Sequence, residues 1–356
     1  MKILDAYIGQ VLLRGMLLVA LILLPLFTLL DLVQQLDDIG TGNYGLVDAL
    51  IYEALLMPSY LLNLMPFIAL LGTSLALGSL AYNKELTAMR ASGISILRIG
   101  LSTIRTGGLV MLVLIVIMEW VAPPLHQQAL KRQTMELAGI DVLIEEHGVW
   151  IHQDDRFINV RNIYQGHTPT NIHIFEFEPG EHRLRHYLHA DRAETDDRKQ
   201  WLYKDLILKD YTGKRVETRY EKEHVRESYL TDKQLQVLEV PINSLPPSGL
   251  YHYLKYLRDS GQATERFELV FWQKITLPVA VVVMMLFSFP FVFGSMRVTN
   301  TGKRIVLATI AGVSFQLISQ LLANLGLMLD LSPLLTTLTP IAIILVLGIV
   351  MMRRAF

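Results

Sequence analysis

The sequence contains no cysteine. This absence excludes a disulfide framework, zinc sites with thiolate ligands, iron–sulfur clusters and thiol nucleophiles in one step. Charged residues are also scarce, at 18% of 356 residues, and 32 Lys and Arg are balanced by 33 Asp and Glu. Because no block or stripe of basic residues stands out, the sequence does not indicate a nucleic-acid partner.

Motifs for nucleotide binding and hydrolysis are missing as well. Gly302-Lys303 resembles the end of a phosphate-binding loop, but Arg297 stands where that loop requires its first glycine. Neither the His-Glu-x-x-His zinc motif nor the Gly-x-Ser-x-Gly nucleophile elbow occurs. Three histidines lie in a segment that alternates like a strand, which favours a solvated face over a metal site: His182, His186 and His189. We therefore predict a protein that is not an enzyme and binds no metal.

Long apolar runs dominate the sequence instead. Hydrophobic residues make up 52% of it, and the surplus lies at the two ends. Six runs have about the length of ~20 helical residues that a bilayer requires: residues 8–33, 49–82, 99–122, 269–293, 305–329 and 334–352. We predict an α-helical integral membrane protein with six transmembrane helices, three on each side of a polar insert.

The positive charges predict the orientation of these helices. Lys and Arg gather at one set of helix ends: Lys2, Lys84, Arg90, Arg98, Arg297, Lys303, Arg304, Arg353 and Arg354. The opposite short connections, residues 31–48 and 330–332, hold none. Because Lys and Arg are retained on the cytoplasmic side, we expect both termini and residues 83–98 in the cytoplasm and the insert outside.

The polar insert, residues 125–267, has the pattern of a β domain. Short, partly alternating segments are separated by turn-prone residues, which predicts a sandwich or an open jelly roll. Residues 248–261 then form a predicted amphipathic helix that leads back to the membrane. The predicted domains are residues 1–124, 125–267 and 268–356.

Two features mark the end of the third apolar run. Pro123-Pro124 is expected to stop the helix. Glu119, beside Trp120, lies at the predicted outer interface, where a functional role and an ordinary capping role are both open.

A short charged segment, residues 83–98, separates the second and third runs. Read as a helix over about residues 83–95, it places Leu86, Met89 and Arg90 on one face. Glu85 falls in the first turn, where a carboxylate suits the helix dipole, and Gly93 follows as a terminator. From the pattern alone the segment is either a helix that docks into a groove on a cytoplasmic partner or an ordinary polar connection.

Two stretches resemble the LptF/LptG family of lipopolysaccharide export permeases. They are Glu85-Leu-x-x-Met89-Arg-Ala-Ser-Gly93 and Glu119-Trp-Val-Ala-Pro123, and residues 248–262 resemble the LptG branch in particular. The resemblance implies an inserted periplasmic β-jellyroll-like domain. It also implies a permease subunit of the ABC transporter that extracts lipopolysaccharide from the Gram-negative inner membrane and passes it towards the outer membrane.

The resemblance further implies partners and site residues. The partners would be LptF, two copies of the ATPase LptB, LptC and LptA, with ATP and Mg at the ATPase and no cofactor held by this chain. Residues 83–95 would be the coupling helix, in which Glu85 pairs with a basic ATPase residue and Leu86, Met89 and Arg90 enter the groove. Apolar side chains chosen by position would line a lipid cavity: Leu30, Leu64, Phe67 and Phe315.

One departure from the family concerns the lipid headgroup. Relatives carry lysines at the outer end of the first span and at the start of the second, whereas this sequence has an acidic stretch at residues 31–38 and Ser59. Acidic residues repel phosphates unless divalent cations bridge them. We therefore expect Lys131 and Arg132, the nearest outer basic pair, to receive the headgroup.

Two other functions are compatible with the sequence. The chain is alternatively a membrane-anchored periplasmic scaffold or sensor, or a mechanotransmitting ABC subunit without a lipid cavity. Copurification with an ATPase would exclude the scaffold, and bound lipid between the spans would exclude the mechanotransmitter.

Overall fold

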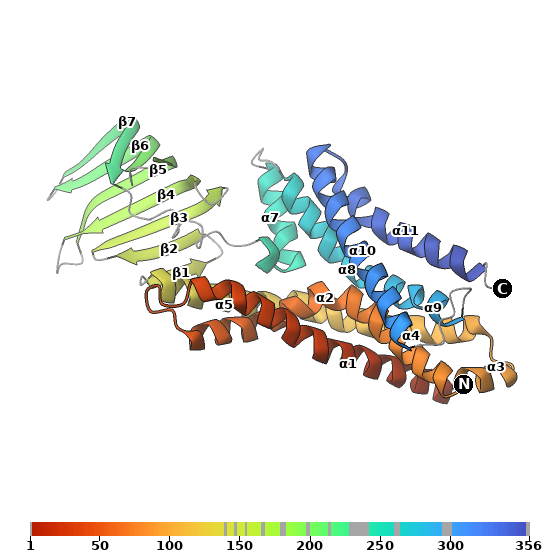
Figure 1. Ribbon diagram of the computed structural model, residues 1–356. Helices are drawn as coiled ribbons and strands as arrows, with labels where there is room; N and C mark the ends of the chain where they lie inside the picture. Colours follow the sequence, from red (N-terminus) through yellow and green to blue (C-terminus); the bar gives the residue numbers. More distant parts are fainter. Residues whose placement is uncertain are drawn as a thin grey trace. The chain divides into compact units, whose positions relative to one another are not determined.

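A computed structural model describes most of the chain (Figure 1). The described residues are 2–138, 141–145, 148–153, 155–164, 168–178, 183–196, 200–212, 215–227, 242–259, 264–293 and 301–353. They form two compact units. The first comprises Met1–Asp31, Leu56–Leu125 and Ile242–Phe356, and the second comprises Leu32–Leu55 and His126–Pro241. His182, Arg354 and most of the predicted basic loop at residues 296–304 lie outside the described residues.

Six helical segments in the described residues are long and apolar enough to cross a membrane: Ile3–Asp37, Leu46–Tyr82, Ile96–Leu137, Glu265–Phe293, Gly302–Met328 and Pro333–Arg353. They contain α1 (Lys2–Gln34), η1 (Gln35–Asp37), α2 (Leu46–Tyr82), α4 (Ile96–Val116), η2 (Ile117–Val121), α5 (Ala122–Ala138), α8 (Glu265–Phe287), α9 (Phe289–Phe293), α10 (Thr301–Met328) and α11 (Pro333–Arg353). The predicted arrangement of three spans on each side of an insert is confirmed.

The third span does not stop at the proline pair. A π-helical turn, η2, leads directly into α5, and Pro123-Pro124 lies in the first turn of α5. Proline lacks the N–H that an α-helix needs from its interior residues. The wider π turn just before the pair changes the hydrogen-bond pattern there, so the helix continues past the prolines.

The core of the first unit is built from buried apolar side chains of α1, α2, α4, α8, α10 and α11. Close packing of α1 on α2 depends on small residues. A Cβ atom at Gly72 would lie 2.5 Å from the Cα of Met16, and one at Gly15 would lie 3.0 Å from the Cβ of Ala76. Such small residues let helix backbones approach closely where no water drives association.

Among its described residues, the second unit contains a seven-stranded antiparallel sheet in which sequence neighbours are sheet neighbours (Figure 1). Its strands are β1 (Asp141–Glu145), β2 (Gly148–Gln153), β3 (Arg156–Tyr164), β4 (Thr168–Phe177), β5 (Leu184–Asp196), β6 (Gln200–Thr212) and β7 (Arg215–Glu227). The apolar side chains of β3 to β6 form its core, with Trp201 and Tyr203 fully buried. The predicted β domain is confirmed. The described strands form a meander, and the likeness to a jelly roll stays a prediction.

After a short turn, η3 (Ile242–Ser244), the helix α7 (Pro247–Asp259) returns the chain to the spans. Its inner face carries Leu250, Leu254 and Leu257, which are all at most 4% exposed. The predicted amphipathic helix at this position is confirmed.

Candidate functional site

The charged segment between the second and third spans folds as a short helix, α3 (Glu85–Ala91). Gly93 follows with φ +84°, a left-handed conformation that favours glycine. The amide of Ile94 then donates to the carbonyl of Met89 at 3.0 Å, and Ser95 caps α4 by accepting from the amide of Arg98 at 3.2 Å. A helix ended by Gly93 is confirmed, but it is shorter than the predicted residues 83–95 because the chain turns at Gly93. The turn between α3 and α4 is closed by these hydrogen bonds.

The structure corrects the predicted outer face of α3. Leu86 is only 4% exposed and belongs to the core of the first unit, and Met89 packs against the same core. The exposed positions of α3 are Thr87, Ala88, Arg90 and Ala91. Leu86 is already buried against other apolar side chains of the same chain. It therefore anchors α3 to the spans and does not point outward.

Glu85 is held by the first span. The hydroxyl group of Tyr7 in α1 donates to Oε2 of Glu85 at 2.6 Å. The side-chain amide of Asn83 approaches Oε1 of the same carboxylate at 3.5 Å. Tyr7 and Glu85 are 78 residues apart, so the local sequence pattern could not predict this contact.

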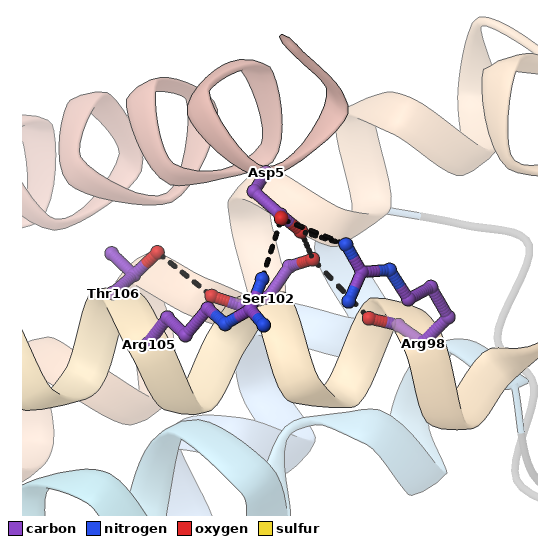
Figure 2. Close-up of polar contacts among 5 residues, drawn as sticks. All are labelled: Asp5, Arg98, Ser102, Arg105 and Thr106. Atoms are coloured by element: carbon purple, nitrogen blue, oxygen red, sulfur yellow. Dashed lines mark hydrogen bonds and ion pairs between the residues drawn. The ribbon is translucent and has the colours of Figure 1, made fainter. Parts of the chain in front are cut away.

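A second contact between α1 and the neighbouring spans lies two residues earlier (Figure 2). The carboxylate of Asp5 accepts from Arg98 at 2.8 Å, from Arg105 at 2.6 Å and from the hydroxyl group of Ser102. The side chains of Asp5 and Arg98 are 18% and 20% exposed, whereas Arg105 is 61% exposed. The three donors follow one another at four- and three-residue spacing, which places them on one face of α4. This helical spacing of Arg98, Ser102 and Arg105 is the feature of the sequence from which their common face could have been predicted.

At the ends of the spans that the charge pattern predicts to lie outside, the start of α7 is held at two points. The backbone amide of Ser248 approaches Oε2 of Glu119 at 3.5 Å, and its hydroxyl group donates to Oε1. The ammonium group of Lys274 in α8 donates to the carbonyls of Asn243 at 2.8 Å and Leu245 at 2.5 Å. Of the two roles left open for Glu119, the geometry shows the capping one, because a carboxylate at a helix N-terminus satisfies free N–H groups.

The residues predicted to contact lipid differ in exposure. Leu30 is 55% exposed, Phe315 is buried, and Leu64 and Phe67 pack partly buried against the core of the first unit. Within this chain, Leu30 is therefore the one of the four that offers a largely free surface. Lys131 is half-buried and Arg132 is exposed, both on α5 in the second unit.

The predicted strand character of the histidine segment is confirmed for its described part. His186 and His189 lie on β5, where His186 contacts Asp210 at 2.6 Å and His189 contacts Asp191 at 3.4 Å. Among the residues with described placement, no cluster of three or more metal-ligating side chains is found.

Comparison with known proteins covers nearly the whole chain. The family described as lipopolysaccharide export system permease LptF/LptG matches residues 6–354. The chain is 32% identical over 322 residues to the lipopolysaccharide export system permease protein LptG of Haemophilus influenzae, covering 90% of each chain. It is 31% identical over 342 residues to the protein of the same name from Escherichia coli K12, covering 96% of this chain and 95% of the relative. Since the match runs through all six spans and the inserted sheet, the chain belongs to the LptF/LptG family of lipopolysaccharide export permeases.

Proposed function

We propose that this chain is a permease subunit of the ABC transporter that extracts lipopolysaccharide from the inner membrane and passes it to a periplasmic bridge towards the outer membrane. Support comes from the full-length similarity to proteins named LptG and from six candidate spans around an inserted sheet. The distribution of Lys and Arg favours cytoplasmic termini and a periplasmic sheet.

Energy would come from a partner, because the sequence has no nucleotide-binding loop. In this proposal two copies of the ATPase LptB hold ATP and Mg, LptF forms the second half of the membrane channel, and LptC and LptA receive the lipid. The chain itself contributes binding and movement and no catalytic group.

The observation that carries the proposal is the shape of α3. Its exposed positions are small apart from Arg90, so a groove on the ATPase can approach the helix backbone closely at Thr87, Ala88 and Ala91. Tyr82 and Leu97 flank the helix and are 80% and 82% exposed. We assign these two side chains the apolar contacts previously expected of Leu86, and we assign Glu85 and Arg90 the polar ones.

The lipid would lie against the exposed face of α1, which includes Leu30, in a cavity completed by the second permease subunit. Each acyl methylene that leaves hydrocarbon costs ~0.8 kcal/mol. A lipid with many chains therefore needs work that ATP-driven closure of the cavity can supply. Lys131 and Arg132 on α5 are proposed to receive the phosphorylated headgroup.

The test is ATP-dependent lipid release by the reconstituted complex that carries Glu85→Ala. Removing one partner of a buried pair typically weakens docking by roughly 30-fold or more, so release should be lost although the complex still assembles. Glu265→Ala, an exposed carboxylate in the first turn of α8, serves as the control and should behave like the parent.

Three outcomes would contradict the proposal in different ways. Unchanged release with Glu85→Ala would mean that the ATPase acts elsewhere, for example at residues 296–304. Failure to copurify with any ATPase would favour the scaffold. Copurification without lipid that crosslinks to α1 would favour the mechanotransmitter.

A further inference from the structure

We infer that Asp5 and Tyr7 are positioning residues that join the first span to the docking helix, so that movement of α3 displaces α1 directly. We call this group the cytoplasmic clamp; its members are Asp5, Tyr7, Glu85, Arg98, Ser102 and Arg105. The inference rests on the proposed role of α3 as the docking site for the ATPase.

One side of the clamp is the set of contacts made by Asp5 (Figure 2). A single carboxylate accepts from two guanidinium groups and one hydroxyl group of α4. Without Asp5, α1 would offer no carboxylate to Arg98 and Arg105 of α4. The electrostatic attraction that holds this end of α1 against α4 would then be lost.

The contact between α1 and α4 extends beyond Asp5. Gly9 lies one turn further along α1, and a Cβ atom there would be 3.1 Å from the hydroxyl oxygen of Thr106. Ile8 and Leu12 of α1 are fully buried. The first three turns of α1 are therefore packed as well as ion-paired, which makes them suited to move together with α4.

The other side of the clamp is the hydrogen bond from Tyr7 to Glu85 at 2.6 Å. Tyr7 and Asp5 are in the same turn of α1, so one turn holds both α3 and α4. The short turn between α3 and α4 is fixed by the bonds at Ile94 and Ser95. Tilting α3 without α1 would break the Tyr7 bond or this turn, and the three helix ends consequently behave as one body.

The clamp matters because α1 is connected to α3 along the chain only through the whole length of α2. The first span is also sparsely covered, since less than a quarter of its apolar stretch is buried within the chain. Its open face includes Leu17, Leu21 and Ile22, each at least 60% exposed. Side-chain contacts at the clamp thus pass a cytoplasmic movement directly to a span whose other face is free for lipid or a second subunit.

The natural absence of cysteine permits a direct test. The double variant Asp5→Cys with Ser102→Cys replaces the carboxylate–hydroxyl contact by two thiols, and a short bifunctional thiol reagent rejoins them. In the reconstituted complex, the reduced variant should release about 2- to 30-fold less lipid per ATP hydrolysed than the parent, the range typical of substitutions along a coupling path. Crosslinking should restore the parent's ratio of lipid released to ATP hydrolysed. In each single cysteine variant, the same reagent should leave this ratio unchanged.

A milder pair of variants addresses the tyrosine and does not threaten folding. Tyr7→Phe removes one oxygen atom and should lower lipid release per ATP while the ATPase still copurifies and hydrolyses ATP. Its effect should be less than additive with that of Glu85→Gln, because Gln keeps an acceptor oxygen but loses the charge, so that both changes weaken the same bond. Tyr220→Phe, on the exposed face of β7, is the matched control.

The outcomes separate this inference from the proposed function. If Glu85→Ala uncouples release while the reduced double cysteine variant and Tyr7→Phe match the parent, the clamp is overturned and the docking role of α3 stands. A crosslinked variant that stays uncoupled, or thiols that cannot be joined, would also overturn the clamp. Unchanged release with Glu85→Ala would overturn the proposed function itself.

Discussion

The guanidinium group of Arg304 in α10 lies directly against the bare backbone of Gly78 in α2. Arg304 is only 4% exposed, and a Cβ atom at Gly78 would overlap its Nη1 and Cζ atoms. The arginine therefore occupies the space that any side chain at position 78 would need, close to the predicted cytoplasmic ends of both helices.

Gly78→Ala should consequently destabilise the chain. The guanidinium group must move to admit the methyl group. Because it is buried but ends a flexible side chain, the cost should lie near the low end of the usual overpacking range of about 1–3 kcal/mol. The measurement is the thermal midpoint of unfolding in detergent. Gly108→Ala is the control, because a Cβ atom there meets nothing within 4 Å. Equal midpoints for the two variants would contradict the packing of Arg304 on Gly78.

Loss of the carboxylate at position 119 should loosen α7. Glu119→Ala leaves the amide and hydroxyl groups of Ser248 without this acceptor, and loss of a helix cap generally raises local opening by about 2- to 30-fold. Amide hydrogen exchange of α7 in the intact complex measures the effect. Exchange in β5 should stay as in the parent. Parent-like exchange throughout α7 would show that Lys274 and the leucine face suffice to hold the helix.

Alkaline pH should weaken the connection between the first two spans through Tyr44. Burial raises the pKa of Tyr44 to about 12, and Asp38, Glu53 and Asp48 act in the same direction. Its hydroxyl group donates to Gln35 at 2.6 Å. Because the unfolded chain ionises near the ordinary tyrosine pKa of about 10, the stabilisation is complete below pH ~10 and is lost as the pH rises towards ~12.

The corresponding measurement is the free energy of unfolding across that alkaline range for the parent and for Tyr44→Phe. The variant should be less stable near neutral pH, because the bond to Gln35 is gone, and should lose less stability on going to high pH. Tyr220→Phe corrects for the other tyrosines. Parallel pH profiles for the parent and Tyr44→Phe would contradict the assignment.

The basic pair on α5 provides a prediction about the lipid. The double variant Lys131→Ala and Arg132→Ala should reduce photo-crosslinking of lipopolysaccharide and slow growth of cells that depend on it, because two cations are lost from the proposed headgroup site. Lys222→Ala, an exposed cation of β7, is the control. Unchanged crosslinking and growth would remove both residues from the site, and recovery on adding divalent cations would point to bridging by the acidic stretch at residues 31–38.

Much of the architecture could be read from the sequence because each span is specified locally. A bilayer demands about 20 apolar residues whose backbone groups bond within their own helix, so a run such as residues 334–352 needs no knowledge of its neighbours. The same holds for α7, whose leucine spacing marks its buried face, and for the glycine that ends α3. Local pattern misled at Pro123-Pro124, where a π turn lets the helix continue.

The sequence by itself determined six spans, the inserted strands, the charge asymmetry and a short helix between the second and third spans. Only the tertiary structure decided which way that helix faces and what holds it. Seven residues make two turns, too few for periodicity to tell whether Leu86 meets the spans or a partner. The bonds from Tyr7 to Glu85 and from Ser102 to Asp5 join residues 78 and 97 positions apart. Such contacts arise when folded helices pack side by side, and no local rule of spacing specifies them.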